Sequence, residues 1–249
     1  MTEAADRHIG AEDRPQVTPG EPDRSALRDA STVVLVRRDG DQPAVLMGMR
    51  GAKAAFMPSK YVFPGGAVDP EDREVSLAGE ISDLTQARLT LEPRTDSASS
   101  PTQLVAAGLR ELAEETGLLI GRPGRSEVVG YAEAGLMPDA SALHYVFRAI
   151  TPPGRPRRFD ARFFMADAAT VAGDLDDFSR ACDELSHLHW VPMSKARALQ
   201  LPFITEVVLA ECAAMVAAAQ GGPLMPPPSV PFFDNRDARS RFIQLGAGA

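Results

Sequence analysis

The sequence lacks the features that mark several large classes of protein. Its two cysteines, Cys182 and Cys212, are too few for a disulfide framework or for a thiolate zinc site. No apolar run reaches the length that crosses a bilayer, and residues 1–28 lack the apolar core of a signal peptide. We therefore expect a cytoplasmic protein that neither spans nor binds a membrane.

Positive charge is also scarce. The chain has 26 lysines and arginines against 34 aspartates and glutamates, which gives a formal net charge of −8. This balance argues against nonspecific binding to nucleic acid. It does not exclude a phosphate-bearing substrate, because metal ions and local arginines can screen the charge of a site. Hydrophobic residues make up 44% of the 249 positions, so the chain can bury a sizeable core.

The order of apolar segments predicts one α/β domain. Residues 1–28 are polar and charged and predict a disordered tail, whereas residues 223–249 begin with a proline-rich stretch that predicts a linker-like tail. Between them, residues 29–222 mix strand and helix patterns, which predicts a mixed sheet between helical layers. The expected strands are 32–36, 44–49, 142–150, 159–165 and 188–192, and the expected helices are 102–115, 194–201 and 203–220.

The most informative feature is an acidic helix that ends at a glycine. Residues 109–118 read Leu-Arg-Glu-Leu-Ala-Glu-Glu-Thr-Gly-Leu. Glu111, Glu114 and Glu115 stand at i, i+3 and i+4 and share one helix face. Arg110 can neutralise only one of these charges, so a divalent cation over the face explains them well. From this segment alone, a solvated face with an Arg110–Glu114 pair is the alternative.

A glycine-rich turn upstream favours the cation. Residues 61–69 read Tyr-Val-Phe-Pro-Gly-Gly-Ala-Val-Asp, and glycine lets backbone approach whatever the acidic helix binds, because it has no Cβ. Together the two segments resemble the Nudix box of the Nudix hydrolases. That box is a glycine, five residues, a glutamate, seven residues and then Arg-Glu-apolar-x-Glu-Glu-x-Gly-apolar. Residues 110–118 match its second half at every fixed position, and Gly65-Gly66 resemble its opening glycines.

The spacing departs from the family pattern. The separation of Gly66 and Arg110 is 110 − 66 = 44 positions instead of 14, so about 30 residues are inserted, at about 67–101. The position eight before Arg110 holds Thr102, so the role of the outer glutamate is absent or is supplied from the insertion. The open candidates are Glu71, Asp72 and Glu80. The insertion predicts a helix over 75–91 and an exposed loop over 95–101, whose shortening we expect to change stability little.

A box interrupted after Phe-Pro-Gly-Gly resembles the coenzyme A-type branch of the family. That branch carries an apolar strand, an arginine, a second basic residue and a glycine before Phe-Pro-Gly-Gly. Residues 46–50 supply the strand and Arg50, whereas the second basic position falls near Ala55 and the glycine position is Ser59.

The resemblance implies a Nudix-type α/β/α sandwich that hydrolyses a diphosphate bond in a nucleoside-diphosphate-linked small molecule. It implies Mg²⁺ or Mn²⁺ as cofactor, with coenzyme A or acyl-coenzyme A as the favoured substrate. The expected metal ligands are Glu114, Glu115, Glu111 and the carbonyl of Gly65; the expected catalytic residues are Glu111 and Arg110. We expect Arg50 and Glu184 to face the substrate, with Asp183 and Glu133 as alternatives to Glu184.

Two other functions stay open at this stage. The chain could hydrolyse a dinucleotide or a nucleotide sugar, or it could be a catalytically silent Nudix-fold module that binds a nucleotide or a partner protein. Family habit also makes a homodimer reasonable. The apolar helix 203–220 offers a surface for it, although the same helix could instead cover the sheet.

Overall fold

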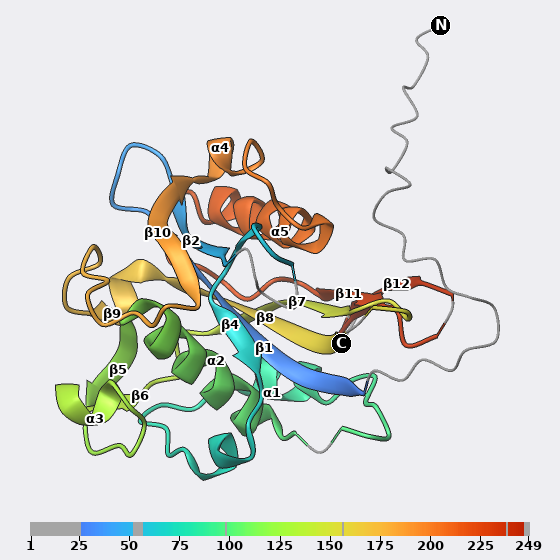
Figure 1. Ribbon diagram of the computed structural model, residues 1–249, viewed down its shortest axis with the longest axis horizontal. Helices are drawn as coiled ribbons and strands as arrows, with labels where there is room; N and C mark the ends of the chain where they lie inside the picture. The colour runs from blue at the N-terminus through green and yellow to red at the C-terminus, as the bar shows by residue number, and fades with distance from the viewer. Residues whose placement is uncertain (1–25, 52–56, 98, 156, 238, 247–249) are drawn as a thin grey trace, which may run out of the picture.

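Strand β1 (Leu27–Arg37) is an inner strand of a large mixed sheet in the computed structural model (Figure 1). The structure describes residues 26–51, 57–97, 99–155, 157–237 and 239–246. The predicted tail 1–28 lies mostly outside them, but its last residues, Leu27 and Arg28, already belong to β1. The sheet runs in the order β10-β2-β1-β8-β7-β11-β12, and β1 is parallel to β8 and antiparallel to β2.

The remaining strands and helices have these bounds. The strands are β2 (Ala44–Arg50), β3 (Tyr61–Val62), β4 (Gly65–Ala67), β5 (Leu119–Pro123), β6 (Leu136–Pro138), β7 (His144–Ile150), β8 (Arg158–Asp167), β9 (Val171–Ala172), β10 (Leu185–Pro192), β11 (Val230–Asp234) and β12 (Arg241–Leu245). The helices are α1 (Asp83–Leu89), α2 (Pro101–Thr116), α3 (Tyr131–Ala134), α4 (Met193–Ala196) and α5 (Phe203–Ala219), with 3₁₀ turns η2 (Pro70–Glu74) and η3 (Ala168–Thr170).

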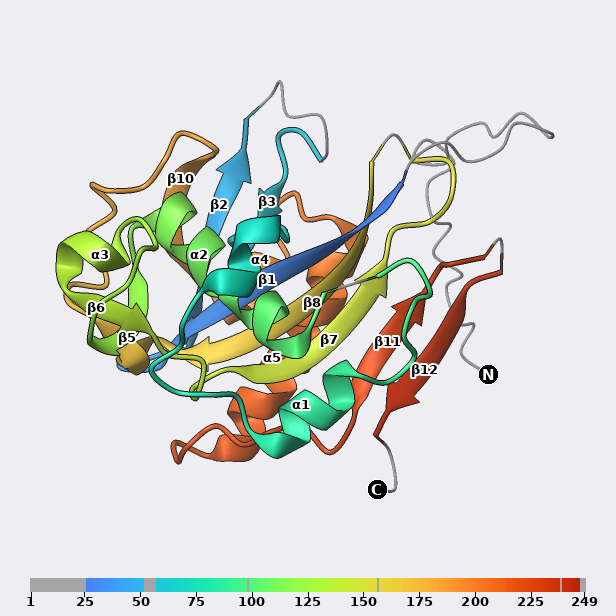
Figure 2. The ribbon, with the colours of Figure 1, turned by 90° about the horizontal axis from the view of Figure 1, so that it is seen from below.

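The alternation of side chains along β1 explains the layers. Val33 and Leu35 point into the core under α1 and α2, whereas Val34 and Val36 point into the core under α5. Helices therefore cover both faces of the sheet (Figures 1 and 2). The predicted helix 203–220 is confirmed, and it covers the sheet. Within the described part of the chain, no helix is both long and apolar enough to cross a bilayer.

The predicted acidic helix is also confirmed and has clear end signals. Ser100 caps α2 by accepting a hydrogen bond from the amide of Gln103 at 3.1 Å, and Pro101 occupies the first turn. Gly117 ends the helix with φ of 76°, and its amide donates to the carbonyl of Ala113 at 2.8 Å. These signals fix where the acidic face of α2 begins and ends.

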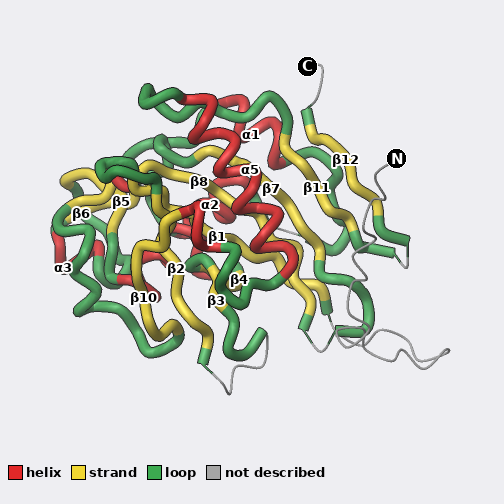
Figure 3. Tube along the Cα trace, turned by 90° about the horizontal axis from the view of Figure 1, so that it is seen from above, coloured by secondary structure: helices red, strands yellow, loops and turns green. Residues whose placement is uncertain are grey.

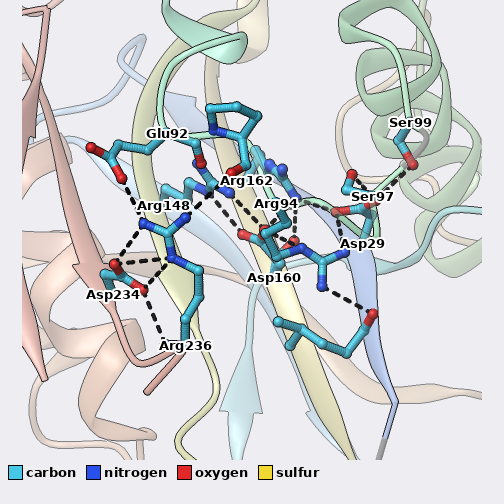
Figure 4. A network of polar contacts seen from close by, with 12 residues as sticks. Asp29, Glu92, Arg94, Ser97, Ser99, Arg148, Asp160, Arg162, Asp234 and Arg236 are labelled. Atoms are coloured by element: carbon cyan, nitrogen blue, oxygen red, sulfur yellow. Dashed lines mark hydrogen bonds and ion pairs between the residues drawn. The ribbon is translucent and has the colours of Figure 1, made fainter. Parts of the chain in front are cut away.

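The insertion differs from its predicted form. Only Asp83–Leu89 of the expected helix 75–91 is helical, because Ser82 caps the chain there and accepts from the amide of Thr85. The segment before it is irregular and packs Leu77 and Ile81 against the core. The expectation that the loop 95–101 matters little to stability has no support in its contacts, since Ser97 and Ser99 both donate to the carboxylate of Asp29 (Figure 4).

The prediction of a C-terminal tail was wrong. Strand β11 pairs in parallel with β7 and antiparallel with β12, so the chain beyond residue 223 extends the main sheet (Figures 2 and 3). Burial of Val230, Phe232 and Leu245 in the core explains this pairing. The proline-rich stretch does not act as a free linker, because Arg88 of the insertion donates to the carbonyls of Pro227 and Pro228 at 2.6 and 2.7 Å.

Candidate active site

Arg110 stands at the centre of a group of carboxylates on α2 and η2. Asp72 is 1% exposed and receives two hydrogen bonds from the Arg110 guanidinium, at 2.8 and 3.0 Å. The same guanidinium donates to the carbonyl of Ala67 at 3.1 Å and to the carboxylate of Glu111 at 3.0 Å. This bidentate pair fixes the plane of the guanidinium. It also ties the first turn of the insertion to the acidic helix.

Of the three inserted acids considered for the outer acid position, Asp72 is the one that contacts Arg110. Glu71 and Glu80 are exposed and make no contact with Arg110, and Thr102 lies exposed in the first turn of α2. The sequence held a signal for Asp72, because 72 − 66 = 6 is the spacing of the box from its glycine to its outer acid. The inserted residues therefore lie after the position of the outer acid. Counting eight positions back from Arg110 consequently reaches Thr102 and not Asp72.

Glu115 is the most deeply buried acid of α2, at 1% exposure. Its Oε2 accepts a hydrogen bond from the amide of Gly65 at 2.7 Å. Its Oε1 is buried without a hydrogen-bond partner, and the nearest cation is the guanidinium of Arg50 at 3.9 Å. The structure therefore brings together three predicted site residues, from β2, β4 and α2.

Glu111 lies against the second glycine of the Phe-Pro-Gly-Gly turn. A Cβ added to Gly66 would come within 2.5 Å of the Glu111 carboxylate carbon, so any larger residue there would push that carboxylate aside. Close approach recurs one turn earlier on α2, where a Cβ on Gly108 would lie 2.7 Å from Ser31 Oγ of β1. Small residues on both sides thus let the acidic helix approach the sheet.

The environment perturbs both inward-facing acids. Burial raises the pKa of Glu111 to about 7; Glu114 and Glu184 add repulsion, which Arg110 partly offsets. Burial likewise raises the pKa of Glu115 to about 8, helped by Glu111 and Glu184 and opposed by the Gly65 amide and Arg50. Glu184, which directly precedes β10, therefore lies close enough for its charge to act on both acids.

Glu114 behaves differently from its two neighbours. Its side chain is 42% exposed and forms an ion pair with Arg110 at 3.1 Å, as in the ordinary i, i+4 pair. It lines a pocket of about 390 Å³ at the end of α2, together with Glu133 and Cys182. In the described residues, no three acidic, histidine or cysteine side chains are already arranged to hold a metal. The expected set of three glutamate ligands is therefore not assembled.

The two alternatives to Glu184 occupy less central positions. Glu133 accepts a hydrogen bond from the amide of Gly130 at 2.5 Å and so caps α3. Asp183 is exposed beside Glu184. Neither is among the largest causes of the pKa shifts of Glu111 and Glu115.

The donor set nevertheless fits a hard divalent cation. A buried carboxylate oxygen without a partner is unfavourable, and Oε1 of Glu115 is such an atom. Glu111 and Glu184 contribute further negative charge at the same place, which raises the pKa of Glu115. A cation with oxygen ligands would satisfy Oε1 and relieve this repulsion. Glu115 and Glu111 are the side chains best placed to hold it.

Known proteins resemble this chain in sequence and in fold. No protein-family model matches the chain. The putative nudix hydrolase 7 of Caenorhabditis elegans is 27% identical over 184 residues, which cover 67% of this chain and 52% of that protein. The chain thus spans about half the length of the curated relative that it matches.

Solved structures give the clearer comparison for the fold. The NUDIX hydrolase from Alicyclobacillus acidocaldarius has a TM-score of 0.57 and 24% identity, over 82% of this chain and 100% of that chain. RenU, a Nudix hydrolase from M. smegmatis, has a TM-score of 0.45 and 17% identity, over 80% and 90% of the two chains.

The chain therefore has the mixed α/β fold of the Nudix hydrolases, which confirms the predicted fold class. The curated relative carries the name of the same family, which agrees with this fold. Neither comparison bears on the coenzyme A-type branch.

Proposed function

We propose that this protein hydrolyses a diphosphate bond in a nucleoside-diphosphate-linked small molecule with the help of Mg²⁺ or Mn²⁺. The observation that carries the proposal is the buried, unpartnered Oε1 of Glu115 beside Glu111 and Arg50. When bound there, a divalent cation neutralises charge on the diphosphate oxygens and lowers the pKa of a water molecule.

Glu111 is the proposed general base. Burial raises its pKa to about 7, and a cation bound beside it would favour the ionised carboxylate, the form that can accept a proton. The hydrogen bond from Arg110 at 3.0 Å holds this carboxylate against Gly66. Glu111 would accept a proton from the attacking water at its free carboxylate oxygen.

Arg110 and Asp72 are the proposed positioning pair. Asp72 makes two hydrogen bonds to Arg110, and its own Oδ2 accepts from the amide of Asp69 at 2.8 Å. Arg110 can therefore turn little, and Glu111 keeps its direction. In this role Asp72 takes the place of the outer glutamate of the family pattern.

Arg50 and Glu184 are proposed to face the substrate. Arg50 ends β2, its side chain is 21% exposed, and it lies beside Glu115, so its guanidinium can pair with a phosphate oxygen. Coenzyme A or acyl-coenzyme A is the favoured substrate, since Arg50 occupies the arginine position of the coenzyme A-type pattern and the box is interrupted behind Phe-Pro-Gly-Gly. A dinucleotide and a nucleotide sugar are the alternatives within the same reaction class.

Glu111→Gln tests the proposed chemistry, because glutamine keeps the size of the side chain but accepts no proton at neutral pH. With coenzyme A, acyl-coenzyme A, a dinucleoside polyphosphate and a nucleotide sugar as substrates, saturating Mg²⁺ or Mn²⁺ should give hydrolysis of one of them. The variant should lower that turnover by about 10²–10⁴-fold. Glu127→Gln, at an exposed position in the loop between β5 and α3, is the matched control and should keep full activity.

Two outcomes would contradict the proposal at different levels. Near-normal turnover of Glu111→Gln would assign the base to another group, for which Glu184 is the candidate acid from outside α2. No hydrolysis of any substrate by the unmodified protein, with nucleotide binding retained, would favour a silent nucleotide-binding module.

A further inference from the structure

Gln103 is a buried polar residue on the face of α2 that carries Arg110. The two residues stand seven positions apart, so they lie on the same side of the helix, two turns from each other. Gln103 is 5% exposed, and its Nε2 donates a hydrogen bond to the carbonyl of Asp69 at 3.1 Å. The proposed function uses Arg110 but gives Gln103 no role.

Stability alone does not account for an amide at this position. Among the described residues, Oε1 of Gln103 is buried without a hydrogen-bond partner, and a buried polar atom of this kind costs free energy. An apolar side chain of similar length would avoid that cost. The contact with Asp69 is therefore what distinguishes glutamine from such a side chain here.

Asp69 begins the turn η2, which carries Asp72. The two residues form a reciprocal pair: the amide of Asp69 donates to Oδ2 of Asp72 at 2.8 Å, and the amide of Asp72 donates to the carbonyl of Asp69 at 3.2 Å. Gln103 donates to that same carbonyl. A side chain of α2 thus holds the backbone that sets the position of the Asp72 carboxylate.

Arg110 holds the same segment at other points. Its guanidinium donates to the carbonyl of Ala67 at 3.1 Å and to both carboxylate oxygens of Asp72. Gln103 and Arg110 therefore bind residues 67–72 from one face of α2, along which β4 lies (Figure 1). Without Gln103, the turn would be free to pivot about Arg110, and Asp72 would move with it.

We propose that Gln103 is a positioning residue for Glu111. It acts through Asp69, which fixes the turn that carries Asp72. Asp72 in turn fixes Arg110, the residue that directs Glu111. The inference rests on the proposed function, in which Glu111 accepts a proton from the attacking water. The side chain of Gln103 bonds Asp69 and not Arg110, so its effect on Glu111 passes through the turn.

Gln103→Met tests this role, because methionine keeps the length of the side chain but donates no hydrogen bond. The first readout needs no activity: it is the exchange of the Arg110 Nε–H with solvent, followed by NMR of the full chain. This group donates to Asp72 at 2.8 Å. Its exchange should become about 2–10-fold faster in Gln103→Met, the factor that corresponds to one lost hydrogen bond.

Ser82→Ala is the matched control for a merely structural effect. Ser82 caps α1 in the same insertion and accepts from the amide of Thr85, so its loss loosens the insertion away from the turn. The exchange of the Arg110 Nε–H and the turnover should both stay unchanged in this variant.

Turnover gives the second readout, on whichever of coenzyme A, acyl-coenzyme A, a dinucleoside polyphosphate or a nucleotide sugar the unmodified protein hydrolyses. With saturating Mg²⁺ or Mn²⁺, Gln103→Met should lower kcat by about 10–10²-fold, as expected when a catalytic group is slightly displaced, with KM and cation affinity unchanged. In an Asp72→Ala background the same change should lower kcat by less than about 2-fold, because the residue that transmits the effect is gone.

Three outcomes would contradict parts of this reasoning in different ways. Unchanged exchange of the Arg110 Nε–H in folded Gln103→Met would overturn the inference. A loss of kcat of equal size with and without Asp72, or a raised KM with unchanged kcat, would overturn it equally. An unmodified protein that hydrolyses none of the substrates would contradict the proposed function instead, and the exchange at Arg110 would still decide whether Gln103 positions that residue.

Discussion

Replacement of Asp160 by asparagine is expected to destabilise the protein strongly. Asp160 is fully buried, and its Oδ2 forms ion pairs with Arg148 at 2.7 Å, Arg94 at 3.0 Å and Arg162 at 3.2 Å (Figure 4). Arg94 comes from the insertion, and the other two arginines come from β7 and β8. One carboxylate therefore joins the insertion to the sheet.

The magnitude follows from the charges that remain. Asparagine has nearly the same size as aspartate, but at this position it would leave Arg94 and Arg162 with Asp29 as their buried carboxylate partner. The buried guanidinium of Arg148 would keep its hydrogen bonds to the carbonyls of Leu91 and Glu92 but lose its ion pair. Loss of one partner from a buried ion pair lowers the free energy of unfolding by about 3–5 kcal/mol. Arg94→Met should lower the free energy of unfolding less, because the two arginines that remain, Arg148 and Arg162, are still balanced by the two aspartates Asp29 and Asp160.

Urea unfolding at neutral pH measures these changes. Asp96→Asn is the matched control, since Asp96 also pairs with Arg94 but its side chain is 64% exposed, and it should change the free energy of unfolding by less than about 1 kcal/mol. If Asp160→Asn shifts the unfolding midpoint no more than Asp96→Asn does, the network does not hold the insertion as described.

Two further predictions concern the same network. The double variant with Ser97→Ala and Ser99→Ala should lower the free energy of unfolding by about 1.5–3 kcal/mol for each hydroxyl removed. The reason is that the two hydroxyls donate hydrogen bonds to the charged Asp29 at 2.6 and 2.9 Å. An unchanged melting temperature of this variant would instead show that the loop is dispensable for stability. Burial alone would raise the pKa of Asp29, but Arg162, Ser97 and Arg94 outweigh burial and lower that pKa below 3.8. The ionised Asp29 carboxylate therefore contributes its full stabilisation above pH 3.8, and this stabilisation is lost as the pH falls below that value. Urea midpoints between pH 5 and 3 should fall more steeply for the unmodified protein than for Asp29→Asn, and equal slopes would contradict this.

The sequence predicted best where local chemistry decides the structure. The helix around Glu111 was recognisable because its acidic face, Pro101 and the closing Gly117 are all local signals. The same holds for the hairpin of β1 and β2, which surrounds a Gly-containing turn. Such features require no knowledge of the rest of the fold.

The sequence predicted poorly where distant residues decide. The burial of Arg148 and Arg162 depends on aspartates on other strands and on Arg94 of the insertion, which no local pattern reveals. The C-terminal strands were missed because the prolines before them resemble a linker, whereas Arg88 binds two of their carbonyls. Asp72 was identifiable by its spacing from Gly66, but its contact with Arg110 required the fold.

Cation binding by Glu115 is the central claim, and calorimetric titration of Mn²⁺ or Mg²⁺ tests it most directly without relying on activity. Glutamine at position 115 still fits beside Gly65, but it lacks the negative charge of the carboxylate whose Oε1 accepts no hydrogen bond. The unmodified protein and the exposed-site control Glu127→Gln should bind one of these cations, and folded Glu115→Gln should bind it at least about 10-fold more weakly. Equal affinity in folded Glu115→Gln and the unmodified protein would contradict the account.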